Sequence, residues 1–238
     1  KEIESGSLIL TATSRLAVKV RESWAQYQQE QGNSAWAEPE IFAIEHWINE
    51  TWLRCCDAGV FEISNGAIIS EQAEHLIWEE VIKNDSVPPS YSGLARDSYN
   101  IMQRWEIPHE KLKNDAPLFY QWISDFNLAL KKYNYITEAD SAKALLEKFK
   151  VKTLVSIEGI VTLGFDKIPP LYLSLLSAVS KNITQEPGLS SHKEQRAAPA
   201  QRAQFFDGKQ EIRAAAKWAR ALRIKHPDHR IGIITPIS

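Results

Sequence analysis

Short apolar runs and longer amphipathic segments alternate over the first 70 residues of the chain. The run before Thr11 and the run at residues 39–44 predict two β-strands, and each leads directly into a segment with apolar residues at helical spacing. The first helix is expected to begin at Ser14 as its N-cap and to end near Gly32, and the second is expected to stop at Gly59. The pattern therefore predicts two consecutive strand–helix units.

From residue 70 to residue 150 the hydrophobic period is that of helices only. Ser70 is the expected start of the first helix, one side of which is predicted to consist of Ala73, Leu76, Ile77 and Glu80. Three further helices are predicted at residues 94–105, 117–133 and 137–149. Thr137 and Asp140 have the spacing of a capping pair at the start of the last helix.

Strand signals return after residue 150. A β-rich stretch at residues 157–163 precedes a helix with Pro169 in its first turn. The polar segment 183–201 predicts a mobile loop. Three elements are expected after it: a strand or extended piece at 204–206, a helix at 208–225 and a last strand at 230–235.

Strands that alternate with helices predict an α/β fold with a parallel sheet and right-handed crossovers. Residues 1–69 and 151–238 are assigned to this sheet domain, and the helical block 70–150 is assigned to an insertion subdomain. The chain is also expected to be the N-terminal piece of a longer protein, because it stops on a newly formed strand with no helix to cover it.

The composition is that of a globular protein, with 44% hydrophobic and 24% charged residues among 238. The formal net charge of −2 excludes a global basic field, so binding to nucleic acid would need a local patch. We expect no membrane span and no secretion signal. Cys55 and Cys56 are adjacent in a helical pattern, which favours one buried and one half-exposed thiol in a reducing cytoplasm.

Two segments lie where a parallel sheet would bind a ligand, beyond the carboxyl ends of its strands. Thr11, Thr13, Ser14 and Arg15 form a strand–helix junction, the usual place of a phosphate loop, but the junction has no glycine and no lysine. Arg15 is either a solvated side chain or a contact for an anion at the helix N-terminus.

The second segment is "LGFDKIPP", in which Asp166 stands where a nucleotide hydrolase holds magnesium. Lys167 follows it in place of a second acid, and the alternative role of Asp166 is to cap the next helix. No catalytic residue and no metal site is predicted. Asp207-Gly208-Lys209 and Pro227-Asp228 have the wrong order for a PD-(D/E)XK nuclease and are interpreted as chance matches.

Five blocks resemble, in order and spacing, the N-terminal part of bacterial DNA repair proteins or exonucleases similar to the B subunit of AddAB-type helicase–nucleases. They are LILTATSRLAVKVRESW, PEIFAIEHWINETW, ISEQAEHLIWEEVI, LGFDKIPPLYLSLLSAV and EIRAAAKWARALRIKHPDHRIGIITP. The resemblance implies an inactivated superfamily I helicase region with a P-loop-like sheet. It also implies a nuclease domain much later in the chain, and Mg²⁺ is expected only there.

The resemblance places Thr11–Arg15 at the degenerate phosphate loop and Asp166 at the first acid of the family's "GFD" segment, whereas Lys167 departs from the acid often found next. Trp36 lies where helicases of this superfamily contact single-stranded DNA, and burial against the sheet is the alternative. Seven other tryptophans lie on helical apolar faces and are expected in the core: Trp24, Trp47, Trp52, Trp78, Trp105, Trp122 and Trp218. Four basic residues near the end are candidate phosphate contacts, with a solvated helix face as the alternative: Lys217, Arg220, Arg223 and Arg230.

The leading hypothesis is a DNA-guiding or partner-docking scaffold that does not hydrolyse ATP. Its expected partners are single-stranded or duplex-end DNA and a helicase subunit. Two alternatives stay open. One is a divergent ATPase that uses Asp166 and Arg15, and the other is a protein-interaction module built on the helices of residues 70–150.

Overall fold

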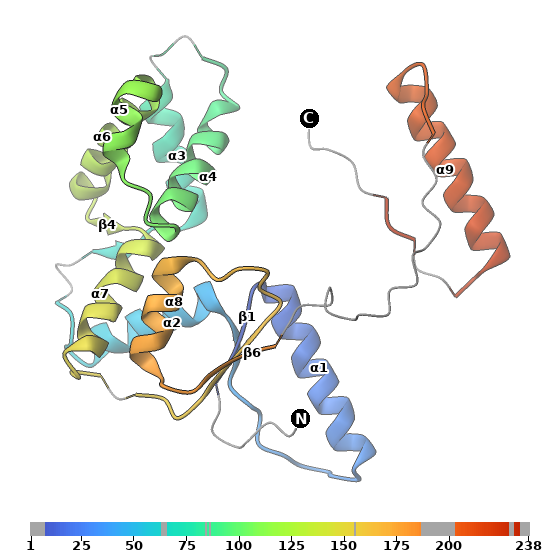
Figure 1. Ribbon diagram of the computed structural model, residues 1–238, viewed down its shortest axis with the longest axis horizontal. Helices are drawn as coiled ribbons and strands as arrows, with labels where there is room; N and C mark the ends of the chain where they lie inside the picture. Colours follow the sequence, from blue (N-terminus) through green and yellow to red (C-terminus); the bar gives the residue numbers. More distant parts are fainter. Residues whose placement is uncertain are drawn as a thin grey trace. The chain divides into compact units, whose positions relative to one another are not determined.

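The structure is a computed structural model that describes residues 8–62, 66–83, 85, 87–154, 156–186, 203–228 and 231–233. The chain forms two units, residues 1–191 and residues 192–238. The first unit holds the sheet and the helices from α1 to α8, and the second holds helix α9 (Figure 1).

Four parallel strands form the main sheet, in the order β2-β1-β5-β6. They are β1 (Leu8–Thr11), β2 (Ile41–Ala43), β5 (Ile160–Leu163) and β6 (Ile183–Glu186). All four residues of β1 are buried, as expected of a central parallel strand with helices on both faces. The predicted α/β class with a parallel sheet is confirmed.

One strand lies where the sequence predicts a loop. β6 pairs with β5, with Thr184 opposite Val161, although residues 183–201 are polar. Backbone groups supply this pairing, so an edge strand tolerates exposed Thr184 and Gln185. The loop prediction is therefore wrong for residues 183–186, and residues 187–201 lie outside the described part of the chain.

Helices cover both faces of this sheet (Figure 1). On one face lies α1 (Ser14–Glu30), whose Ala17 packs against Ile9 and Ile41. On the other face lie α2 (Ile44–Asp57), α7 (Glu138–Lys150) and α8 (Pro170–Val179). This second face carries the larger core, which buries among others Leu10, Trp47, Leu145 and Leu175.

A second core lies among α3 (Glu71–Ile82), α4 (Tyr91–Arg104) and α6 (Pro117–Lys132). The Trp78 ring stacks on Phe126 at 4.3 Å between centroids, and Tyr99 meets Phe126 edge-on at 5.3 Å. A short 3₁₀ turn (His109–Lys111) and α5 (Leu112–Asp115) join α4 to α6.

The predicted helical block 70–150 contributes to both cores. α3, α4 and α6 form the helical core, whereas α7 packs on the sheet with α2 and α8. The block also contains β4 (Tyr135–Ile136), which pairs with β3 (Ala67–Ile68). The prediction of helices only is wrong at β4, because two residues are too few to show alternation. The assignment of residues 70–150 to a separate subdomain stays a prediction.

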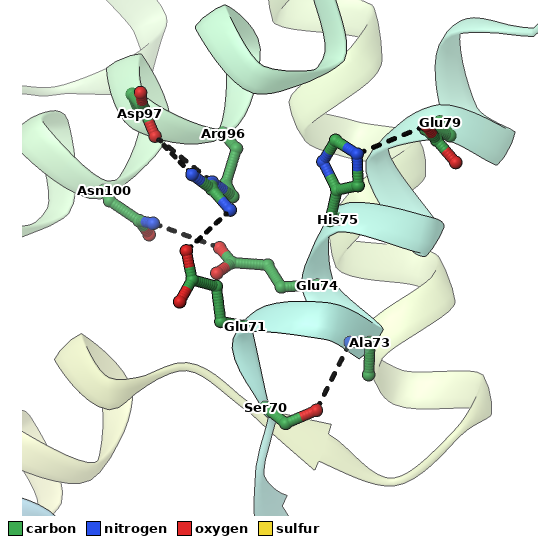
Figure 2. Close-up of polar contacts among 9 residues, drawn as sticks. All are labelled: Ser70, Glu71, Ala73, Glu74, His75, Glu79, Arg96, Asp97 and Asn100. Carbon is green, nitrogen blue, oxygen red and sulfur yellow. Dashed lines mark hydrogen bonds and ion pairs between the residues drawn. The ribbon is translucent and has the colours of Figure 1, made fainter.

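The inward side of α3 also differs from the prediction. Ser70 caps the helix as expected, accepting a hydrogen bond from the Ala73 N–H at 3.2 Å (Figure 2). The buried residues, however, are Glu74, Trp78 and Ile82, and Leu76 is 63% exposed. Glu74 turns toward α4 because Asn100 donates to its carboxylate at 3.1 Å (Figure 2).

Helix α9 (Gly208–Lys225) has the predicted bounds. Asp207 caps it by accepting a hydrogen bond from the Gln210 N–H at 2.7 Å. No residue of α9 is buried. No strand forms at residues 204–206, which leaves the alternative of an extended piece. Residues 231–233 are not in a strand, contrary to the prediction, while Arg230 and residues 234–235 lie outside the described residues.

Candidate functional site

The two predicted ligand-binding segments lie at the same edge of the sheet. β1 and β5 are hydrogen-bonded neighbours, with Thr11 opposite Leu163. The junction into α1 and the loop from Gly164 to Lys167 therefore both leave the sheet at its carboxyl edge. The structure brings together the segments that sequence reasoning selected.

Two hydroxyl groups of the first junction, those of Thr11 and Thr13, form hydrogen bonds within it. Thr11 is fully buried, and its hydroxyl donates to the Thr13 carbonyl at 2.9 Å. The Thr13 hydroxyl accepts from the Leu16 N–H at 3.2 Å, which makes Thr13 the N-cap of α1. The prediction that Ser14 is the cap is wrong, because Thr13 has the extended backbone a cap needs and Ser14 is already helical.

Leu16 and Gly164 occupy the space between the two segments. Gly164 has φ +77°, and a Cβ at this position would overlap with Cδ2 of Leu16. An apolar side chain thus rests directly on the loop after β5. A phosphate loop needs backbone N–H groups around an open space at this position, and here one N–H is capped and the space is filled.

Arg15, Asp166 and Lys167 lie on the surface around this contact. All three side chains are exposed and form no ion pair with another described residue. Asp166 does not cap α8, because that helix begins at Pro170 and the cap position is Pro169, so the capping alternative is wrong. These three residues surround the edge without forming a joint site.

A polar cluster that sequence reasoning missed lies between four helices. Arg104 Nη2 lies 2.7 Å from Glu138 Oε2 and 2.8 Å from Glu45 Oε1. The Tyr172 hydroxyl donates to Glu138 at 2.6 Å, and the Arg104 guanidinium lies 5.7 Å from the centre of the Tyr172 ring. No local spacing reveals this cluster, because its members come from α2, α4, α7 and α8.

The pKa shifts of Glu138 and Tyr172 indicate a structural role for this cluster. Burial raises the pKa of Glu138, against the opposing effect of Arg104. Burial also raises the pKa of Tyr172, and the Glu138 carboxylate adds to that shift. The Tyr172 hydroxyl therefore stays protonated and donates to Glu138. The cluster connects the helical core to the sheet core.

A second missed network surrounds the start of the 3₁₀ turn. The Lys143 ammonium can only donate, so the Gln103 oxygen faces it and the Gln103 amide N–H₂ faces His109 Nε2 at 3.2 Å. His109 Nε2 must then be an unprotonated acceptor. Burial lowers the pKa of His109, and Lys143 adds to the shift, whereas Glu110 and Asp140 oppose it.

The tryptophan candidates divide by exposure. Of the seven expected in the core, Trp47, Trp52, Trp78 and Trp122 are buried and Trp24 is half-buried. Trp105 and Trp218 are 40% and 55% exposed, so the prediction is wrong for them, because a helix buries only the side that a neighbour covers. Trp36, the candidate DNA contact, is half-buried in an irregular segment before β2.

The basic candidates lie in the second unit. Lys217, Arg220 and Arg223 are exposed on α9. Arg220 and Arg223 border a hollow of about 570 Å³ next to Ile231 and Ile233. Arg230, the fourth candidate, lies outside the described residues.

The charge of the chain is strongly segregated. Residues 192–238 contain ten Lys and Arg against four Asp and Glu, a net charge of +6. Residues 1–191 contain eighteen against twenty-six, a net charge of −8. The net charge of −2 thus conceals a basic unit that could attract a polyanion.

Cys55 is buried and Cys56 is half-buried, both as free thiols, as predicted. Burial raises the pKa of both thiols, so neither is an activated nucleophile. Within the described ranges, no three His, Cys, Asp or Glu side chains gather as a metal site requires. Among those same residues, no helix has both the length and the apolarity to cross a membrane.

Comparison with protein-family models finds none that matches this chain, and comparison with curated proteins finds no match either.

Proposed function

We propose that residues 1–238 act as a DNA-guiding and partner-docking scaffold within a DNA repair nuclease. In this proposal the sheet unit is a helicase-like region, related to the B subunit of AddAB-type enzymes, that does not hydrolyse ATP. Single-stranded or duplex-end DNA is the ligand, and a helicase subunit is the partner.

The contact between Leu16 and Gly164 carries this proposal. A triphosphate needs open space and free N–H groups at the β1–α1 junction. Leu16 fills that space and its N–H is capped by Thr13. In this proposal the β1–β5 edge is a degenerate nucleotide site in which Leu16 occupies the place of the phosphates.

The segregated charge supports DNA as the ligand. A unit with a net charge of +6 concentrates the favourable potential for a polyanion in residues 192–238. The first unit has a net charge of −8 and repels DNA, so it opposes non-specific binding of DNA outside residues 192–238.

Thermal unfolding in the presence of each ligand tests the proposal. We expect Mg-ATP to leave the midpoint of unfolding unchanged, because a ligand that does not bind the folded state adds no stability. A single-stranded oligonucleotide should raise the midpoint at about 50 mM salt and have less effect at about 200 mM, because phosphate contacts release counterions.

The divergent ATPase makes the opposite prediction. A midpoint raised by Mg-ATP in the wild type and not in Asp166→Asn would contradict the scaffold proposal. The Asp166 side chain is exposed and unpaired among the described residues, so this substitution should leave the fold intact.

A second candidate function, protein interaction by the helical core, is favoured by one surface. Leu94, Ile101 and Trp105 lie on the same side of α4 and are 62%, 55% and 40% exposed. If a helicase subunit docks there, Leu94→Ser with Ile101→Ser should abolish co-purification. Leu128→Ser, at a residue of α6 that is 64% exposed, should not.

A further inference from the structure

We propose that one stripe of α9, formed by Lys209, Arg213, Lys217 and Arg220, binds the phosphodiester backbone of DNA without reading its sequence. This inference rests on the proposed DNA-guiding function and specifies where and how the nucleic acid is held. It adds Lys209 and Arg213 to the candidates found by sequence, and it places the contact on α9 instead of at Trp36.

The four side chains share one side of the helix. At 3.6 residues per turn they fall within about 80° of one another around the helix axis. From Lys209 to Arg220 the rise is about 16 Å, a length over which one strand of duplex DNA carries about five phosphates. The stripe is therefore long enough to place four cations along about five phosphates of one strand.

The cations of α9 are available for such contacts. The helix contains six Lys and Arg and one acidic residue, Glu211. All six basic side chains are exposed, and none forms an ion pair with another described residue. Two arginines of the first unit differ, since Arg96 and Arg104 are each paired with two carboxylates.

An anionic membrane surface is the competing ligand for a basic amphipathic helix. Such a helix inserts its apolar side while flanking cations reach the headgroups. The apolar arc of α9 lies about 160° from the cation stripe, but its Ala215, Ala219 and Leu222 are half-buried, and Ala219 borders the hollow next to Ile231 and Ile233. Part of this arc therefore faces residues of the second unit and is not free for insertion, so DNA is the favoured ligand.

The hollow beside Ile231 and Ile233 decides which cations of α9 are best substituted in a test. Arg220 and Arg223 border it, so their removal would also disturb packing within the second unit. Lys209, Arg213 and Lys217 do not border it. Gln at these three positions removes the charge and keeps helix propensity nearly unchanged.

Binding of the full chain to labelled DNA over a range of salt concentrations tests the stripe. The variants are Lys209→Gln/Arg213→Gln/Lys217→Gln and a control, Lys113→Gln/Lys131→Gln/Lys181→Gln, which removes three exposed charges from the first unit. We expect the α9 variant to bind more weakly. The slope of log K against log salt should fall in magnitude by about 2.7 for duplex and about 2.1 for single strands. The control variant should bind DNA like the wild type. A DNA of scrambled sequence should bind the wild-type chain as tightly as the first DNA does.

Each other outcome overturns the inference in a recognisable way. Wild-type binding with equal losses in both variants, or no loss in the α9 variant, would place the DNA elsewhere while the scaffold proposal stands. No DNA binding by the wild type would remove both. Binding to phosphatidylglycerol vesicles that exceeds DNA binding at equal salt, and that is lost in the α9 variant, would assign the stripe to a lipid surface. Circular dichroism of both variants shows that α9 and the other helices remain formed.

Discussion

Single residues decide how closely the two loops at the carboxyl edge of the sheet approach each other. Gly164 has a positive φ and lies under Leu16, so it meets two demands at once, a left-handed backbone and the absence of a Cβ. Gly59, which ends α2, has φ +70°, but a Cβ at this position would meet no atom within 4 Å. Alanine at Gly59 therefore costs only the free energy of the left-handed backbone, whereas alanine at Gly164 also costs the free energy of the contact with Leu16.

We predict that Gly164→Ala destabilises the protein more than Gly59→Ala does. Both substitutions place alanine in the left-handed region, at about 1–2 kcal/mol. Only Gly164→Ala also forces a methyl group into Leu16, which adds about 1–3 kcal/mol. Urea unfolding of the two variants measures the difference, and equal losses would mean that Leu16 does not rest on the loop as described.

A second residue-scale prediction concerns His109. Its Nε2 accepts from Gln103, and burial lowers its pKa from the ordinary 6.5. As pH falls below about 6.5, the unfolded chain takes up a proton that the folded chain resists, so stability falls until the folded-state pKa is reached. His109→Gln should lessen this loss of stability between pH 7.5 and 5.5.

His75 provides the control for this comparison. Its side chain is 44% exposed and lies 3.2 Å from Glu79 on the surface of α3 (Figure 2). His75→Gln therefore shows what the loss of a surface imidazole does by itself. Urea midpoints at the two pH values measure both variants, and the idea fails if the two histidines are interchangeable.

At the scale of elements, Arg104 and Gln103 of α4 both reach α7, which packs on the sheet core. Arg96 pairs with Glu71 and Asp97, which are 76% and 63% exposed (Figure 2). Arg104 instead reaches Glu138, whose side chain is only 19% exposed. The same helix thus carries a solvated ion pair and a mostly buried one.

We predict that Arg104→Met costs about 1–3 kcal/mol of stability and that Arg96→Met costs about 0–1 kcal/mol. Loss of Arg104 leaves the Glu138 carboxylate buried without its counter-charge, whereas the partners of Arg96 return to water. Chemical denaturation measures both losses. Adding Glu138→Gln to Arg104→Met should restore part of the stability, and an unchanged double variant would show that the lost ion pair is not the cause.

At the scale of the whole molecule, the two units carry opposite net charges. A chain with a pI near 6.4 would pass a polyanionic column at pH 7.5 if its charge were evenly spread. We predict that it is retained on heparin, because residues 192–238 carry a net charge of +6. The salt needed for elution should fall in the Lys209, Arg213 and Lys217 variant and not in the Lys113, Lys131 and Lys181 control; equal elution of all three would contradict a segregated basic unit.

Local patterns determined much of this fold. The strand before Thr11, the capping pair of Thr137 and Asp140, and the bounds of α9 follow from neighbouring residues, because periodicity and caps are short-range properties. The sequence also selected the two segments that meet beyond β1 and β5, since strand order in a parallel sheet obeys general connection rules.

Only the tertiary structure decided which side chain fills the space between those two segments. Leu16 is an ordinary helical apolar residue in the sequence, and only the pairing of β1 with β5 places it over Gly164. The Arg104–Glu138 pair, the inward side of α3 and the strand β6 likewise depend on partners distant in the chain. A one-dimensional pattern records which residues tend to be buried, and the three-dimensional packing decides which neighbour buries them.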